Sequence, residues 1–146
     1  MSPLELILQV VSAFVGVVTL AVVFQVPKQY LWPAGVTGAA GWLVYLVIKE
    51  SLGNDMFAAF FATVLVAVLS QIFARVLKAP VTIYLVTGIL PLVPGVGMYR
   101  TVYYLLHSDM AQTSYYLSYT LQIAGMIALA IFIVDSIFKR IYRKRT

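Results

Sequence analysis

Two prolines and two glycines, all within residues 91–97, interrupt an apolar stretch that reads PVTIYLVTGILPLVPGVGMYRTVYYLLHS (residues 80–108). Proline removes a backbone donor and clashes with the preceding helical turn, and glycine is the weakest ordinary helix former. The four residues, Pro91, Pro94, Gly95 and Gly97, therefore predict two half-helices joined by unwound backbone. In a bilayer such backbone is tolerated only where protein or a water-filled cavity satisfies its polar groups.

A break of this kind offers backbone sites for ligands of either charge. The second half-helix, about residues 98–107, would begin with unpaired N–H groups near Tyr99, and these suit a carboxylate. The first half, about residues 81–90, would end with carbonyls near Thr87, and these suit an ammonium group. An amino acid carries both groups, so the candidate substrate site is Thr87, Pro91, Pro94, Gly95, Gly97 and Tyr99. The alternative is a structural kink whose backbone is satisfied by neighbouring helices.

Charged side chains supply two further candidates. Arg100 lies about 9 Å along the helix from Pro94, within the hydrocarbon depth, and would bind a substrate carboxylate. Alternatively, it pairs with a carboxylate of another helix or extends to the interface. Asp135 is a candidate for proton coupling, although Lys139, four residues later, also makes an ordinary helix ion pair with it. His107 has no second histidine or cysteine with which to hold a metal.

The composition indicates a membrane protein. Of the 146 residues, 62% are hydrophobic and 10% are charged, whereas soluble domains carry about 25% charged residues. This length accommodates roughly five spans of about 20 residues in one domain, without a soluble catalytic domain. The chain has no cysteine, and no nucleophile, base and orienting group can be assembled. We therefore expect no enzyme activity, no catalytic residue, no metal and no cofactor.

The apolar runs predict an all-α integral membrane protein with about five transmembrane helices, the fourth of them broken. The expected spans of this single domain (1–146) are residues 4–25, 31–48, 56–77, 81–107 with its break at 91–97, and 115–138, before a basic tail at 139–146. Asp55 is expected to cap the third span, and Gln71 to hydrogen-bond a neighbouring helix. Gly35, Gly38 and Gly41 lack the preceding strand of a dinucleotide fingerprint, and the small residues Ala34, Gly38 and Gly41 instead predict a flat face for close helix packing.

The basic residues predict the orientation of the chain. If all five segments cross, one side of the membrane carries Lys28, Arg75, Lys78, Lys139, Arg140, Arg143, Lys144 and Arg145. The other side carries Lys49. Because cytoplasmic loops are enriched in lysine and arginine, the C-terminus is expected inside and the N-terminus outside. A basic run beside a hydrophobic span is typical of this topology signal, so we expect no nucleic-acid partner.

Two stretches carry a resemblance to a known family. TGILPLVPGVGMY (residues 87–99), after a third span that ends in a short basic turn, resembles the signature region of the threonine/serine exporter (ThrE-type) family. VFQVPKQYLWPAGVTGAAGW (residues 23–42) is similar to the first loop and glycine-rich second span of the small membrane subunit of the split exporters, the YjjB-like proteins. Length, apparent spans and basic tail agree, so the resemblance covers essentially the whole chain.

The resemblance implies secondary export of small metabolites across the bacterial inner (cell) membrane, driven by the proton motive force. The substrates would be amino acids such as threonine and serine, or a small dicarboxylate such as succinate. It also implies a partner within the lipid bilayer, a larger membrane subunit of the same family. Assembly of this chain into a homo-oligomer is the alternative that is left open. Pro91, Pro94, Gly95 and Tyr99 are the positions that match the family, whereas Arg100 is matched by no motif. The alternative function is a non-transporting integral-membrane scaffold or assembly protein.

Overall fold

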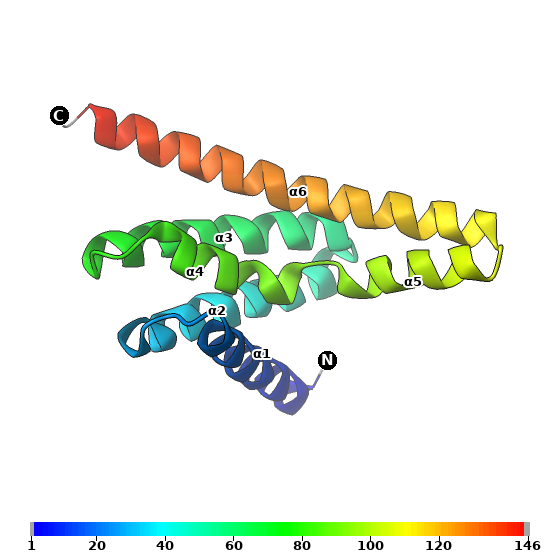
Figure 1. Ribbon diagram of the computed structural model, residues 1–146, viewed down its shortest axis with the longest axis horizontal. Helices are drawn as coiled ribbons and strands as arrows, with labels where there is room; N and C mark the ends of the chain where they lie inside the picture. Colours follow the sequence, from blue (N-terminus) through cyan, green and yellow to red (C-terminus); the bar gives the residue numbers. More distant parts are fainter. Residues whose placement is uncertain (1, 145–146) are drawn as a thin grey trace.

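The computed structural model describes residues 2–144, and in that part of the chain every regular element is a helix (Figure 1). The elements are α1 (Pro3–Val23), α2 (Lys28–Leu52), α3 (Asp55–Val76), α4 (Val81–Ile89), the short 3-10 helix η1 (Leu90–Leu92), α5 (Gly95–Leu106) and α6 (Met110–Arg143). The predicted all-α fold is confirmed.

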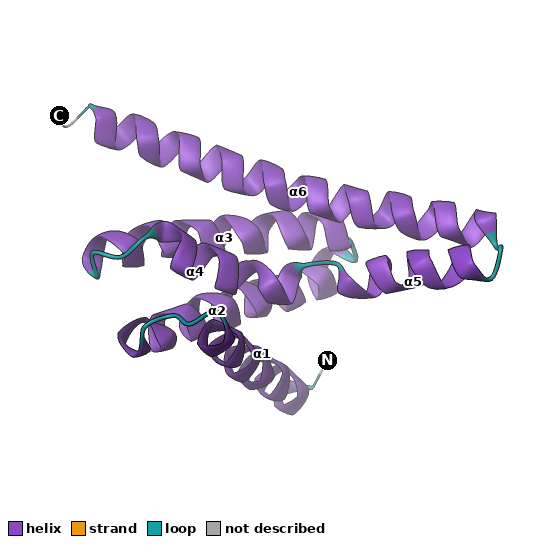
Figure 2. Ribbon diagram, viewed as in Figure 1, coloured by secondary structure: helices purple, strands orange, loops and turns teal. Residues whose placement is uncertain are grey.

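Four of these helices, α1, α2, α3 and α6, are each long and apolar enough to cross a membrane. A fifth span is available if α4, η1 and α5 act together, since Val81–Leu92 and Gly95–Leu106 meet at a bend of 55°. Figure 2 shows a short loop between η1 and α5 at this bend. The predicted break in the fourth segment is therefore confirmed, in an all-α membrane protein with four spans, or five if the bent pair crosses as one.

The helices pack around α2 and α3 through small residues. α2 contacts α1, α3 and α4, and α3 contacts α6, which in turn packs against α5. A methyl group added to Gly38 of α2 would collide with Val17 of α1, and one added to Gly41 would collide with Val66 of α3. Gly35 lies equally close to Phe14 and Val18. The close helix packing predicted at Ala34, Gly38 and Gly41 is confirmed, because Ala34 is buried and the two glycines, together with Gly35, let the neighbouring helices approach.

The two ends of the bundle differ in charge. One end, here called the hairpin end, carries the α2–α3 and α5–α6 turns (residues 53–54 and 107–109). The other, the basic end, carries the turns at residues 24–27 and 77–80 and the last part of α6 (Figure 1). The described basic residues at the basic end are Lys28, Arg75, Lys78, Lys139, Arg140, Arg143 and Lys144. Only Lys49 and Arg100, among the described lysines and arginines, belong to the hairpin end.

Buried apolar side chains fix the broken segment against the other helices. One cluster unites Leu92 of η1 with Ala62 and Val66 of α3 and with Ile123 and Ile127 of α6. In a bilayer such contacts are stabilised by van der Waals packing between the helices, since lipid tails are as apolar as these side chains. Leu92 is 4% exposed. The break therefore occupies a defined place between α3 and α6.

The cap of α3 differs from the sequence expectation. Asn54, rather than Asp55, is the N-cap, because its side-chain oxygen accepts hydrogen bonds from the N–H groups of Met56 (2.9 Å) and Phe57 (3.4 Å). Both residue types are good caps, and the chain enters the helix one position earlier than expected. Asp55 becomes the first residue of α3. Its carboxylate is consequently available to side chains of other helices.

Candidate functional site

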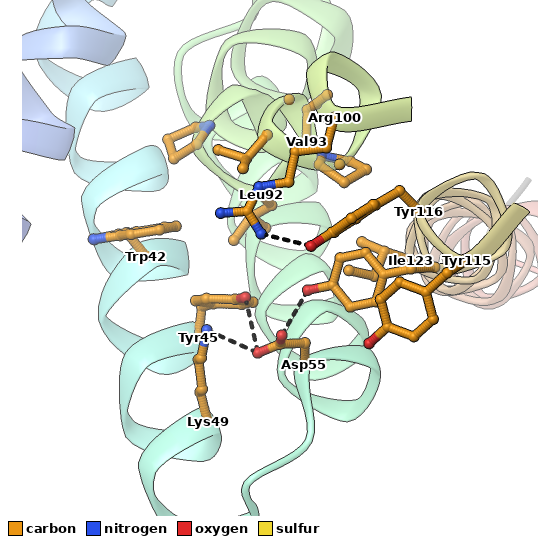
Figure 3. Close-up of a pocket in the computed structure, with 16 residues that line it drawn as sticks. Trp42, Tyr45, Lys49, Asp55, Leu92, Val93, Arg100, Tyr115, Tyr116 and Ile123 are labelled. Carbon is orange, nitrogen blue, oxygen red and sulfur yellow. Dashed lines mark hydrogen bonds and ion pairs between the residues drawn. The ribbon is translucent and has the colours of Figure 1, made fainter. Parts of the chain in front are cut away.

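A cavity of about 620 Å³ lies beside the break in the fourth span (Figure 3). Five elements contribute to its wall: α2, α3, η1, α5 and α6. Its lining residues are Trp42, Tyr45, Lys49, Asp55, all of residues 91–97, Arg100, Tyr115, Tyr116, Tyr119 and Ile123. The interrupted backbone thus borders a space large enough for a small metabolite.

The first turn of α5 presents unpaired donors to this cavity. The Gly95 N–H donates to the Val93 carbonyl (2.8 Å), and the Met98 N–H donates to the Pro94 carbonyl (3.1 Å). Val96 and Gly97 follow Gly95, and within residues 2–144 their N–H groups have no hydrogen-bond acceptor. Orphan N–H groups at the positive end of a helix dipole favour an anion.

The position of the break relative to α3 follows from two neighbouring contacts. A methyl group on Gly97 would collide with the Thr120 hydroxyl of α6. The preceding residue of α6, Tyr119, hydrogen-bonds Asp55, the first residue of α3. The start of α5 is therefore level with the start of α3, and the cavity lies toward the hairpin end of the bundle.

Asp55 is the centre of a polar cluster on the cavity wall. One oxygen of its carboxylate lies 3.0 Å from the Lys49 ammonium and accepts a 3.3 Å hydrogen bond from the Tyr45 hydroxyl. The other oxygen accepts a 2.6 Å hydrogen bond from Tyr119. Figure 3 shows these interactions converging from α2 and α6 on the beginning of α3. The cluster joins three helices and places a negative charge in the lining.

Aromatic rings extend this cluster along α2. The Trp42 ring stacks on the Tyr45 ring at 5.1 Å, and the Lys49 ammonium lies 5.7 Å from the centre of the Tyr45 ring. The sequence interpretation missed the polar cluster, since it assigned Asp55 to a helix cap and used Lys49 only to predict the orientation of the chain. A signal was present: an acidic and a basic residue flank one tight helical hairpin in a chain with only five acidic residues.

Arg100 reaches the same cavity from α5. Its guanidinium donates a 3.0 Å hydrogen bond to the Tyr116 hydroxyl and lies 5.2 Å from the centre of that ring. Within residues 2–144, no carboxylate lies within ion-pair distance of Arg100. Tyr116 therefore orients the side chain without neutralising its charge. With Lys49 and Asp55, Arg100 gives the lining a formal charge of about +1.

The structure brings together some of the candidate site residues. Pro91, Pro94, Gly95, Gly97 and Arg100 all line the cavity. Two others, Thr87 and Tyr99, do not. The Thr87 hydroxyl is buried and donates to the Ile83 carbonyl of its own helix (2.6 Å), and the helical backbone continues past Thr87 into η1. Tyr99 is 67% exposed on the outer side of α5.

Asp135 lies at the basic end, away from the cavity. One of its oxygens lies 2.7 Å from the Lys139 ammonium, and the other accepts a hydrogen bond from the Gln71 amide (3.3 Å). The latter contact confirms that Gln71 bonds a neighbouring helix. Gln71 also accepts from Arg75 (2.7 Å), whose guanidinium lies 3.9 Å from the centre of the Tyr142 ring. The pair expected between Asp135 and Lys139 is present, and the proton-coupling role stays a hypothesis.

Comparison with known proteins identifies one family. The family model described as threonine/serine exporter, ThrE, matches residues 9–137, which is nearly the whole chain. No curated protein and no solved structure matches the chain. The match includes both halves of the broken span and every residue that lines the cavity.

Proposed function

Because the chain belongs to the threonine/serine exporter family, we propose that it is a subunit of a secondary transporter that binds its substrate in the cavity beside the broken helix. The substrate is a threonine- or serine-type amino acid, or a small dicarboxylate such as succinate. The observation that carries the proposal is the junction of η1 and α5, where unpaired N–H groups border a cavity of about 620 Å³.

A carboxylate is common to these substrates, and the cavity offers it two kinds of donor. The N–H groups of Val96 and Gly97 supply directional hydrogen bonds at a helix N-terminus. Arg100 adds a full positive charge that no neighbouring carboxylate neutralises among the described residues. Such donors recognise the charge of the carboxylate while leaving room for different small side chains.

We assign a partner to the outer face of α6. Ser114, Ser118 and Gln122 border a groove between α6 and Met56 of α3. Gln122 is exposed and, within residues 2–144, its amide has no hydrogen-bond partner. Polar side chains in a membrane span favour contacts with other helices. The proposed partner is a larger membrane subunit of the same family. Cross-linking at Gln122 tests this assignment, and a cross-link to a second copy of this chain would contradict it.

We place the chain in the bacterial inner membrane, with several spans, the N-terminus outside and the C-terminus in the cytoplasm. The support is the asymmetry between the two ends of the bundle. Seven described basic residues gather at the basic end, and two belong to the hairpin end. With this orientation the cavity lies toward the outer side, where an exporter releases its substrate.

Efflux from cells tests the proposal. Cells are preloaded with threonine-containing dipeptides or with succinate, and they express this chain, the larger subunit, or both. The informative variant is Gly95→Leu, since Gly95 lines the cavity and a Cβ there meets no atom within 4 Å. The leucine is expected to narrow the cavity, and its Cβ would collide with no neighbouring atom. Gly16→Leu in α1 is the matched control, because its Cβ also meets open space and lies outside the cavity.

We expect efflux only when both subunits are present, loss of efflux in Gly95→Leu at normal protein level, and no loss in Gly16→Leu. Unchanged efflux in Gly95→Leu would contradict the location of the site. If the chain is instead a scaffold, co-assembly would persist without efflux of either substrate.

A further inference from the structure

The cavity contains a single carboxylate among the described residues that line it, that of Asp55. This group is 24% exposed and is held from two sides by the hydroxyls of Tyr45 (3.3 Å) and Tyr119 (2.6 Å). Both hydroxyls come from helices other than α3, so the carboxylate keeps its direction whichever cation accompanies it. A carboxylate oriented in this way on a cavity wall is a binding group for a cation.

The cation that accompanies Asp55 in this structure is the ammonium of Lys49, at 3.0 Å. The Lys49 side chain is 51% exposed and extends from the last part of α2 on a flexible stem. The lysine end of this pair is exposed, and water solvates a released ammonium well, which weakens the pair. Lys49 can therefore leave Asp55 without a large loss of stabilising free energy, provided that another ammonium takes its place.

We propose that Asp55 is the specificity-determining residue of the cavity, its carboxylate binding the ammonium group of an amino acid in place of Lys49. The inference rests on the function proposed above and adds the group that recognises the second end of the substrate. The exchange replaces one ammonium by another, so the charge on Asp55 stays compensated. The substrate carboxylate then faces Arg100 and the first turn of α5, which line the same cavity.

This assignment separates the two candidate substrate classes. A zwitterion matches a lining that offers one positive side chain and one free negative side chain once Lys49 has moved away. A dicarboxylate would bring its second carboxylate toward Asp55, and like charges at close range disfavour binding. Asp55 thus selects for amino acids and against dicarboxylates.

The competing explanation is that Lys49 and Asp55 only tie α2 to α3 at the hairpin end. The two explanations predict opposite changes in the affinity for an ammonium ligand when Lys49 is removed. A purely structural pair predicts that removing either partner weakens every ligand. Exchange predicts that removing Lys49 strengthens ammonium binding, because the resident competitor is gone, whereas removing Asp55 weakens ammonium binding strongly.

Ligand binding to the purified full-length chain provides the test. The chain has two tryptophans, and Trp42 lines the cavity while Trp32 is 69% exposed in the first turns of α2. In a Trp32→Phe background, the fluorescence of Trp42 reports occupancy. The probes are threonine, threoninol, which keeps the ammonium but lacks the carboxylate, and 3-hydroxybutyrate, which keeps the carboxylate but lacks the ammonium.

We expect Asp55→Asn to weaken threonine and threoninol by about 10- to 100-fold, as for loss of a hydrogen bond to a charged group, and to leave 3-hydroxybutyrate within about twofold. Lys49→Met is expected to tighten threoninol binding by several-fold. Asp109→Asn is the matched control, because Asp109 caps α6 outside the cavity. In efflux from intact cells, Asp55→Asn should shift the preference from threonine toward succinate.

Equal weakening of all three probes by Asp55→Asn, or weaker threoninol binding in Lys49→Met, would overturn the proposal in favour of a structural ion pair. A chain that binds none of the probes would overturn both the cavity assignment and the role of Asp55. Binding with the expected pattern but without efflux would sustain Asp55 and contradict the transport function. Normal threonine efflux in Asp55→Asn would sustain the transport function and contradict the role of Asp55.

Discussion

The hydroxyl of Tyr119 donates a 2.6 Å hydrogen bond to the carboxylate of Asp55, 64 positions earlier in the chain. The same separation of 64 joins Gln71 to Asp135, whose side chains hydrogen-bond at 3.3 Å toward the other end of the same two helices. α3 and α6 therefore run parallel in one constant register over this length. This register positions both the cavity wall and the polar network of the basic end.

The Tyr119–Asp55 bond should contribute measurably to stability. Tyr119→Phe removes the shorter of the two hydroxyl donors to a partly buried carboxylate, so we expect a loss of about 1–2 kcal/mol in the free energy of unfolding. Denaturant titration of the purified chain in detergent measures it. Tyr115→Phe is the control on the same helix, since Tyr115 lines the cavity but its hydroxyl has no partner among the described residues. Equal stability of the two variants would contradict the importance of this bond.

Gly97 should be required for the contact between α5 and α6. A Cβ at Gly97 would collide with the Thr120 hydroxyl, whereas a Cβ at Gly95 meets nothing within 4 Å. We expect Gly97→Ala to destabilise the chain by about 1–3 kcal/mol, as for overpacking, and Gly95→Ala to have little effect. Thermal unfolding in detergent compares them.

A double variant identifies the cause of the Gly97 effect. Thr120→Ala removes the oxygen that the new methyl group would meet, and the next atoms lie at 3.4 Å (the Tyr119 ring) and 3.6 Å (the Thr120 Cβ). Combining it with Gly97→Ala should restore most of the lost stability. If it does not, the glycine is needed for its backbone conformation rather than for the close approach.

Asp135 should be dispensable for the pH dependence of efflux. Its carboxylate pairs with Lys139 at 2.7 Å on the same helix and is 42% exposed, outside the cavity. Asp135→Asn keeps an oxygen that can accept from the Gln71 amide. We therefore expect the efflux rate to stay within about twofold of wild type, with an unchanged pH profile. A flattened profile would instead support Asp135 as the proton-coupling residue.

The sequence predicted those features that depend on local composition. Apolar runs separated by short polar turns indicate membrane helices, and Pro91, Pro94, Gly95 and Gly97 leave little choice about where the fourth one breaks. The glycine-rich face of α2 likewise indicated close packing, because small residues have few other uses in a bilayer.

The partners of Asp55 could not be predicted in the same way. Tyr119 is 64 positions away, and no local pattern sets the register between α3 and α6. Asn54 and Asp55 are equally good caps, so the sequence did not show which side chain would point into the cavity. Thr87 lies outside the cavity lining for a related reason: the 3-10 turn of η1 continues the helix up to Pro91 and Leu92, and so moves the break beyond Thr87.

Thiol labelling tests whether the broken segment crosses the membrane. The chain has no cysteine, so single cysteines can be introduced without further changes. Ala111 lies just after the broken segment, at the hairpin end, and Thr82 lies at its start, at the basic end; both are exposed. If the segment crosses, an impermeant maleimide added to intact cells reaches Ala111→Cys and not Thr82→Cys.

A re-entrant segment would make a different prediction, because Ala111 and Thr82 would then share one side and react alike. Two further positions fix the absolute orientation. Ser51→Cys, at the hairpin end, should react with the maleimide added to intact cells, as Ala111→Cys does. Phe24→Cys, at the basic end, should react only in permeabilised cells, as Thr82→Cys does. The reverse pattern would place the basic end outside, against the charge asymmetry. It would also turn the cavity and Asp55 toward the cytoplasm, so that the site would take up substrate rather than release it.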